Sequence, residues 1–172
     1  MLNGDCIEVG LVGPEGVPEL LYLLGPTPGT TECFVQMEAT ALRMDFTTFQ
    51  QEFFPLEPVR RVVLRHIQHS TLMIGQIAAC NRLHEVEERL ARWLLMVADR
   101  IGADQFYLTQ EFMSEMVGTR RSTVTIAAGG LKRAGLIDYS RGQIRILDRP
   151  TLEDVACECY PSRVACSTAS IA

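Results

Sequence analysis

Apolar and polar residues follow two different patterns along the chain. One pattern predicts β-strands and the other predicts α-helices. In residues 1–50, two short runs with β character, 6–12 and 32–37, lie among Gly- and Pro-rich stretches such as 25–29. Short apolar runs bounded by turn residues are typical of strands. We therefore expect a few strands of an antiparallel sheet there, too few to close a barrel alone.

A long helix is predicted from about Pro55. Apolar and small positions recur at alternating intervals of four and three, the spacing of a stripe that faces another helix. These positions are Val63, Ile67, Ser70, Ile74 and Ile77, with Asn81 continuing the series. The stripe fits a second copy of the chain or the sheet of its own chain. We favour the second copy, because a thin N-terminal sheet offers little to cover so long a stripe.

A second amphipathic helix follows, and Gly102 suits its end because glycine adopts the left-handed cap conformation without strain. Its apolar positions share one face, and residues of opposite charge alternate on the other. The apolar face holds Leu83, Val86, Leu90, Trp93, Leu94, Val97 and Ile101. The polar face holds Glu85, Glu87, Glu88, Arg89 and Arg92.

Residues 108–133 have the pattern of two short helices joined by a sharp turn. Thr109 suits the N-cap of the first helix, Gly118 its left-handed end, and Thr119 the cap of the second. The small Ser114 leaves room where two helices cross steeply. The inward positions of the second helix are Val124, Ala127, Ala128 and Leu131. Together these features predict a helix-turn-helix.

A β-hairpin is predicted next, over residues 136–146 around Arg141-Gly142. A hairpin beside a recognition helix is a wing, and Arg141 at its tip would meet phosphate. Arginine can form two hydrogen bonds to guanine, and Ser or Thr can bond bases or phosphates. The candidate DNA-contacting residues are Thr109, Gln110, Thr119, Arg120, Arg121, Ser122, Thr123, Thr125, Lys132 and Arg141.

The charge of the 172-residue chain is unevenly distributed. The net charge is −5, but residues 1–58 carry −8 and residues 119–149 carry +5, which suggests an acidic body with one basic working end. The composition is that of a folded protein, with 47% hydrophobic residues. The N-terminus has no export signal, and no apolar stretch approaches the ~20 residues of a membrane helix. We therefore expect a cytoplasmic protein without membrane contact.

Histidines and cysteines are the other candidate chemical groups. His66 and His69 lie three apart on the long helix, with Cys80 and His84 further along, and such spacing can hold a metal or be an ordinary polar face. Cys157 and Cys159, with Cys166 beyond them, could form a thiol or metal patch. Because no second cysteine pair at zinc-ribbon spacing exists, we interpret them as incidental residues near a loose tail.

No enzyme, metal or cofactor is expected. The sequence shows no set of nucleophile, base and orienting residue, and no phosphate loop. The expected activity is therefore binding without chemistry.

The stretch from Asn81 to Tyr160 resembles the C-terminal half of the Crp/Fnr family of bacterial transcription regulators. The matching pieces are HEVEERLARWLLM (84–96), LTQEFMSEMVGTRRSTVTIAAGGL (108–131), AGLIDYSRGQIRI (134–146) and LEDVACECY (152–160). The helix at 55–80 resembles the central dimerisation helix of the family. Residues 4–54 resemble only the late part of its N-terminal sensor barrel.

The resemblance implies a homodimer on double-stranded DNA that binds a pseudo-palindromic operator, with half-sites about 34 Å apart. RNA polymerase is a further candidate partner. Arg121 and Ser122 fall where the family reads bases, and Thr125 and Ile126 fall one turn further along. Ile126 stands where well-known members often carry a polar or basic residue.

Neither cyclic AMP nor an iron–sulfur cluster is expected. The cyclic-nucleotide members hold the phosphate with an arginine, and the corresponding residues 15–31 contain none. The iron–sulfur members carry a cysteine cluster ahead of the barrel, whereas this chain has only Cys6 near its start.

The expected fold is α+β. It comprises a partial antiparallel β-barrel of cyclic-nucleotide-binding type (1–54), a dimerisation helix (55–81), a winged helix-turn-helix DNA-binding domain (82–160) and a flexible tail (161–172). The expected function is a sequence-specific DNA-binding transcription regulator that acts as a dimer. The alternative is an effector-less modulator that heterodimerises with full-length relatives.

Overall fold

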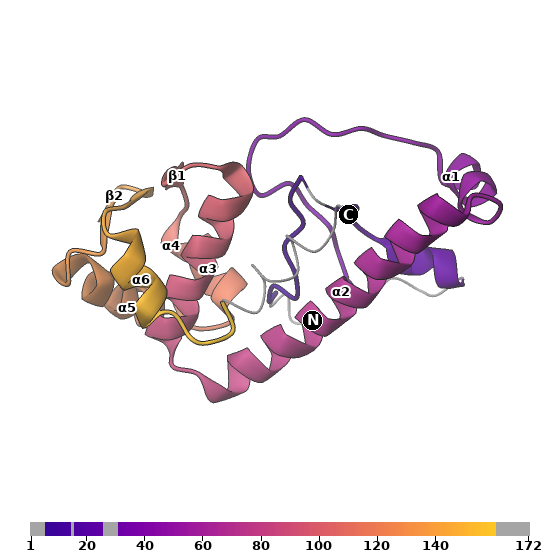
Figure 1. Ribbon diagram of the computed structural model, residues 1–172. Helices are drawn as coiled ribbons and strands as arrows, with labels where there is room; N and C mark the ends of the chain where they lie inside the picture. Colours follow the sequence, from indigo (N-terminus) through magenta and orange to yellow (C-terminus); the bar gives the residue numbers. More distant parts are fainter. Residues whose placement is uncertain (1–5, 15, 26–30, 161–172) are drawn as a thin grey trace.

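The computed structural model describes residues 6–14, 16–25 and 31–160. The expected flexible tail, 161–172, lies outside the described residues. A long helix, α2 (Glu57–Leu83), runs diagonally across the molecule. The short helix α1 (Phe46–Phe53) lies at one end of α2, and a helical domain lies at the other (Figure 1).

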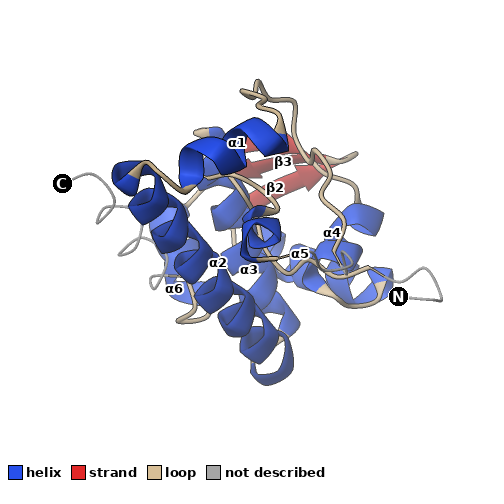
Figure 2. Cartoon of the chain, turned by 90° about the vertical axis from the view of Figure 1, so that its right-hand side faces the viewer, coloured by secondary structure: helices blue, strands red, loops and turns tan. Residues whose placement is uncertain are grey.

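The helical domain is built on α3 (Val86–Ile101), which is followed by α4 (Gln110–Val117), α5 (Arg121–Arg133) and α6 (Arg149–Val155). Its sheet is antiparallel, with strands β1 (Gln105–Tyr107), β2 (Ile137–Ser140) and β3 (Gln143–Ile146) in the order β1-β3-β2. In the view turned by 90°, the strands lie on the far side of α2 (Figure 2). The α+β class and the winged helix-turn-helix are confirmed.

The N-terminal residues do not form the expected barrel strands. Among the described residues before α2 there is no β-strand, and only the 3-10 helix η1 (Leu20–Leu24) precedes α1. A strand requires partner strands for its backbone N–H and C=O groups, and the described residues before α2 provide none. The partial antiparallel β-barrel predicted for 1–54 is therefore wrong for the described residues.

The residues predicted as the first strand lie against the helical domain instead. Trp93 Nε1 donates to the Glu8 carboxylate at 2.8 Å, and Arg100 Nη2 donates to the Leu11 carbonyl at 3.1 Å. The ring of Phe34 meets Phe112 edge-on, with centroids 6.0 Å apart. These contacts hold the N-terminal segment over α3 and α4.

The predicted helical stripe of α2 is partly covered by its own chain. Val63 and Ile67 are buried in a small core with Leu20, Leu23 and Phe53, and Ile77 is buried as well. Ser70 is half-buried and Ile74 is exposed. The expectation that the N-terminal half offers little to cover this stripe is therefore wrong, because η1 and α1 cover its first half.

The helix α3 is buried almost all around. Leu90, Trp93, Leu94 and Val97 are buried as predicted, and Gly102 ends the helix at a φ of 66°. Arg89 and Arg92, predicted on a solvated polar face, are only 5% exposed. Arg89 Nη1 donates to the Asn81 carbonyl at 2.7 Å, which gives the buried guanidinium a partner at the end of α2. Leu83 and Ile101 are exposed and do not belong to the buried face.

The turn between α4 and α5 has the predicted glycine. Gly118 is the C-cap of α4 at a φ of 66°, and its N–H bonds the carbonyls of the last turn. Ser114 is buried, and its hydroxyl donates to the Glu111 carbonyl at 2.6 Å. The prediction that Thr119 caps α5 is wrong. The N-cap is Arg120, one residue later, because Thr119 N–H still bonds the Ser114 carbonyl of α4.

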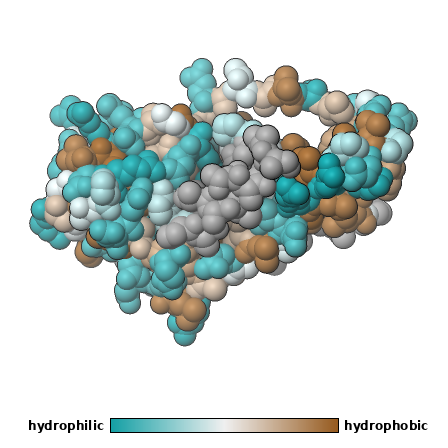
Figure 3. All heavy atoms as spheres, viewed as in Figure 1, coloured by the Kyte–Doolittle hydropathy of each residue, from teal (hydrophilic) through white to brown (hydrophobic). Residues whose placement is uncertain are grey.

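Apolar side chains also remain on the surface, and Figure 3 shows several of them at the α1 end of the molecule. They include Leu24, Phe46, Phe54 and Leu56. Among the described helices, none combines the length and the apolar composition that crossing a bilayer requires.

Two glycine substitutions should affect stability in opposite directions. Gly118→Ala should lower the free energy of unfolding by about 1–2 kcal/mol, because a Cβ disfavours a left-handed residue and would meet the Ile7 side chain. Gly129→Ala, inside α5, should raise it by up to about 1 kcal/mol through helix propensity, since the Cβ would meet only the mobile end of Arg133. Urea unfolding measures both. Equal stabilities for the two variants would contradict this account of the turn.

Candidate nucleic-acid interface

The helix α5 presents two chemically different faces. Val124, Ala127, Ala128 and Leu131 are buried, as predicted. On the opposite face Arg121, Ser122, Thr125 and Ile126 are exposed, and Ile126 is 71% exposed. A helix held by one face and solvated on the other can enter a groove of a nucleic acid without unfolding.

The start of α5 is positively charged, and the first turn of this helix holds no acidic residue to neutralise it. Its N-cap is Arg120, which makes no side-chain capping hydrogen bond. The first N–H groups of a helix have no intrahelical acceptor, and the helix dipole is positive there. This end of α5 therefore favours an anion such as a phosphate group.

The two arginines at this end are available to a ligand. Arg120 is exposed, and the Arg121 side chain is 65% exposed. Arg121 Nη1 lies 3.7 Å from a Glu111 carboxylate oxygen, and that carboxylate is equally exposed. A solvated ion pair of this kind contributes little to stability, so it can open when phosphate approaches.

Polar side chains at the start of α4 meet α5. Thr109 is the N-cap of α4 as predicted, and its hydroxyl accepts from the Phe112 N–H at 3.1 Å. The Thr125 hydroxyl has Gln110 Oε1 at 3.1 Å and the Arg121 carbonyl at 2.9 Å as alternative acceptors. Gln110 is thus placed beside Thr125 on the face of α5 that holds the arginines.

The remaining predicted residues differ in their exposure and in their bonding partners. Ser122 is exposed, whereas Thr119 and Thr123 are half-buried. Lys132 Nζ lies 2.7 Å from a carboxylate oxygen of Asp138 and donates to the Tyr139 carbonyl at 2.9 Å. The Lys132 hydrogen bond and charge lower the pKa of Asp138. Lys132 therefore ties α5 to β2, a role that the sequence did not indicate.

The wing ends in the predicted tight turn. Ser140 pairs with Gln143 across the hairpin, so Arg141 and Gly142 form a two-residue loop. Both have positive φ, 49° and 85°, as a type I′ turn requires. Arg141 is exposed at the tip, which places its guanidinium outside the domain.

The structure also brings together four side chains that could bind a metal ion, and the sequence did not predict that they would meet. The ligand atoms of Cys80, His84, Cys157 and Cys159 all lie within 4.8 Å of one another. The three cysteines are buried, so Cys157 and Cys159 are packed into the structure and not part of a loose tail. The signal in the sequence was the four-residue spacing of Cys80 and His84, which was weighed without the distant cysteine pair. His66 and His69 do not join this group.

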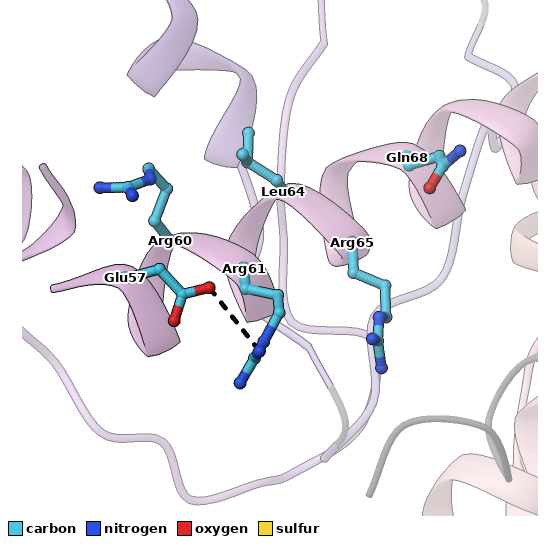
Figure 4. A pocket seen from close by; sticks show the side chains of 6 residues that line it. All are labelled: Glu57, Arg60, Arg61, Leu64, Arg65 and Gln68. Atoms are coloured by element: carbon cyan, nitrogen blue, oxygen red, sulfur yellow. Dashed lines mark ion pairs between the residues drawn. The ribbon is translucent and has the colours of Figure 1, made fainter. Parts of the chain in front are cut away.

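A shallow hollow of about 400 Å³ lies along the N-terminal half of α2. Its lining residues all belong to α2, and Figure 4 shows them along successive turns, with Glu57 and Arg61 forming an ion pair at 3.6 Å. They are Glu57, Arg60, Arg61, Leu64, Arg65 and Gln68. Because one helix supplies every wall, the hollow is a feature of the exposed side of α2 and not an enclosed site.

Comparison with known proteins agrees with this geometry. Residues 88–155 match the model of the Crp-like helix-turn-helix domain, which covers α3 to α6 except the first two residues of α3. The chain is also 24% identical, over 165 residues, to the CRP-like cAMP-activated global transcriptional regulator of Mycobacterium tuberculosis. That match covers 85% of this chain and 74% of the relative.

Solved structures show the same fold. FixK2 from Bradyrhizobium japonicum superposes with a TM-score of 0.59 at 17% identity, over 64% of this chain and 58% of that one. A CRP/FNR-family transcriptional regulator from Thermus thermophilus superposes with a TM-score of 0.55 at 23% identity, over 59% of this chain and 56% of that one. The chain thus matches little more than half the length of these structures.

Fold and interface together define a Crp-like helix-turn-helix module at residues 88–155. The resemblance of the chain to the Crp/Fnr-type transcriptional regulators is confirmed.

Replacing the arginine in the wing turn should stabilise the domain. Arg141→Asn should raise the free energy of unfolding by a few tenths of a kcal/mol, because asparagine adopts positive φ more readily than arginine. Thermal unfolding followed by circular dichroism measures the change. A matched substitution on a paired strand, Arg145→Asn, should not stabilise. A lower transition temperature for Arg141→Asn would contradict the assigned turn.

Proposed function

We propose that the chain is a sequence-specific DNA-binding transcription regulator that binds a pseudo-palindromic operator as a homodimer and inserts α5 into the major groove. The observation that carries this proposal is the exposed, uncapped start of α5 with Arg120 and Arg121 on it. Exposed arginines at the start of a helix whose other face is fully buried suit reading of guanine and binding of phosphate.

We assign two kinds of DNA contact, to bases and to phosphates, to residues of α5 and the wing. Arg121, Ser122 and Thr125 share the exposed face and are the proposed base-reading residues. Ile126 on the same face can contact only apolar groups, and in the major groove the thymine methyl is that group. Arg120 at the N-cap and Arg141 at the wing tip are the proposed phosphate contacts, while Lys132 keeps its contacts with β2.

The distribution of charge supports this orientation. The net charge of +5 lies in residues 119–149, which include α5 and the wing, whereas residues 1–58 carry −8. Duplex DNA would attract the first region and repel the second, which aligns the domain during encounter.

A second copy of the chain is the proposed partner of α2. Since Val63 and Ile67 are covered by their own chain, we assign the interface to the exposed side of α2. That side holds Leu64, Gln68, Leu72, Gly75 and Ala79 at three- and four-residue spacing, and a Cβ at Gly75 would meet nothing within 4 Å. The small residues allow two helices to approach closely.

No effector is included in the proposal. The Mycobacterium tuberculosis relative is named as cAMP-activated. In this chain residues 15–31 contain no arginine to pair with a cyclic phosphate. The heterodimeric modulator has no observation in its favour, because nothing on the described surface distinguishes a relative from a second copy.

DNA binding should depend on Arg121 and on salt. The probe is a duplex selected by the wild-type chain from a random-sequence library, measured by fluorescence anisotropy. Arg121→Ala should weaken binding to this duplex by about 5- to 150-fold and reduce its preference over random DNA, because a bidentate guanine contact contributes about 1–3 kcal/mol.

The matched control is Arg43→Ala, which removes an equal charge from an exposed position before α1. It should leave selectivity unchanged. Arg141→Asn should weaken binding to all sequences alike and reduce the salt slope by about one phosphate contact. Affinity of the wild-type chain that is equal for all duplexes would refute the proposal.

The dimer should depend on the exposed side of α2. Leu72 is 67% exposed in the single chain, so Leu72→Glu should leave its folding intact while placing a charge in the interface. Sedimentation equilibrium should show at least a tenfold higher dissociation constant. Leu42→Glu, at a fully exposed loop position, is the control and should not change it. A dimer unaffected by Leu72→Glu would place the interface elsewhere.

A further inference from the structure

The cluster of Cys80, His84, Cys157 and Cys159 joins two parts of the chain that are distant in sequence. Cys80 lies in the last turn of α2, and His84 is the C-cap residue of that helix. Cys157 and Cys159 follow the end of α6. The four residues therefore connect the end of α2 to the C-terminal end of the helix-turn-helix domain.

The distances within the cluster are those of a tetrahedral site. Cys80 Sγ and Cys157 Sγ are 3.4 Å apart, and Cys159 Sγ lies 3.7 Å from His84 Nδ1. With Zn–S bonds near 2.3 Å and Zn–N bonds near 2.0 Å, tetrahedral geometry gives about 3.8 Å between two sulfurs and about 3.5 Å between sulfur and nitrogen. All four ligand atoms fit within 4.8 Å of one another. A single ion between them would require only small shifts.

The surrounding residues orient the ligands. His84 Nε2 lies 3.0 Å from a Glu158 carboxylate oxygen, which leaves Nδ1 directed at the sulfurs. A carboxylate on the outer nitrogen fixes the tautomer of a metal-binding histidine. Gln76 Nε2 donates to Cys159 Sγ at 2.9 Å, as an amide donates to a thiolate.

Burial and charge favour a closed site. Cys80, Cys157 and Cys159 are 0%, 4% and 2% exposed. Arg92 is also buried, its Nη1 donates to Met96 Sδ, and its Nε has no hydrogen-bond partner among the described residues. Three thiolates, a neutral imidazole and Zn²⁺ carry a net charge of −1, which the Arg92 guanidinium would balance.

We propose that Cys80, His84, Cys157 and Cys159 bind one Zn²⁺ in a closed structural site that fastens the segment after α6 to the end of α2. Three sulfurs and one imidazole nitrogen in a tetrahedron are a ligand set of structural zinc. With no position open for water or substrate, the ion takes no part in a reaction.

Binding conserves charge and protons. Zn²⁺ replaces the protons of the thiols and each thiol binds as its thiolate, so up to three protons leave per ion.

The segment after α6 is held in place by contacts that do not involve the cluster. The buried Tyr160 hydroxyl donates to a carboxylate oxygen of Asp99 at 3.2 Å, and Arg149 Nη2 donates to the Tyr160 oxygen at 2.9 Å. This network fixes the segment on α3. A zinc ion one residue before Tyr160 would then extend the rigid connection to α2.

Metal content of the full chain tests the site. Protein purified under reducing conditions without chelator should contain one zinc ion per chain, measured by elemental mass spectrometry. After exchange, Co²⁺ should give the absorption of tetrahedral thiolate coordination. Cys157→Ser and His84→Ala should lower the metal content at least tenfold, whereas Cys33→Ser, at an exposed cysteine, should retain it.

Removal of the metal from the wild-type chain with a chelator tests the site without relying on a variant that could fail to fold. Removal of the metal should lower the thermal transition, Zn²⁺ should restore it, and Cys157→Ser should not respond. A chain that stays below one-tenth stoichiometry after incubation with Zn²⁺ would overturn the proposal. So would a Cys80–Cys157 disulfide in the reduced preparation, or equal metal loss from Cys33→Ser and Cys157→Ser.

These measurements use no DNA, so they do not rest on the proposed function. Arg121→Ala should retain the metal even though it loses selective DNA binding.

Discussion

The packing of α3 against α5 is the interaction on which the rest of the structure depends. Leu90 and Leu94 are fully buried on α3, as are Val124 and Leu131 on α5. Burial of such side chains contributes about 1.5–3 kcal/mol each, so this contact is a large part of the stability of the domain. Because α5 is held by its entire inner face, the orientation of its outer face is fixed before any ligand arrives.

The turn that places α5 depends on two small residues. Gly118 ends α4 in a conformation that other residues adopt at a cost, and the buried Ser114 lets the helices approach. Arg120 then occupies the cap position, where aspartate or serine would stabilise the helix more. A weaker cap leaves the N–H groups at the helix start open to an external anion, which is the property that the proposed DNA contact requires.

Local patterns in the sequence were sufficient for the C-terminal domain, where neighbouring residues determine the structure. Gly118, Gly142 and the inward face of α5 are local features, and all were predicted. The cap of α5 was misplaced by one residue, from Thr119 to Arg120, and the larger errors concern contacts with distant partners. Arg92 belongs by spacing to a polar face, yet it is 5% exposed and its charge acts on Cys80 of α2, an interaction that the spacing within α3 cannot predict. The N-terminal runs have β character, but a strand requires partners that the described residues before α2 do not supply.

The junction between α2 and α3 gains its rigidity from buried polar groups. Arg89 binds the Asn81 carbonyl near the end of α2, and Arg92 lies beside the cysteine cluster. A buried guanidinium is stable only with partners, so the Arg89 bond to Asn81 constrains where α2 can leave the domain. If α2 pairs with a second copy, the same constraint sets the distance between the two α5 helices. The spacing of the half-sites would then be determined at this junction, far from the residues proposed to contact DNA.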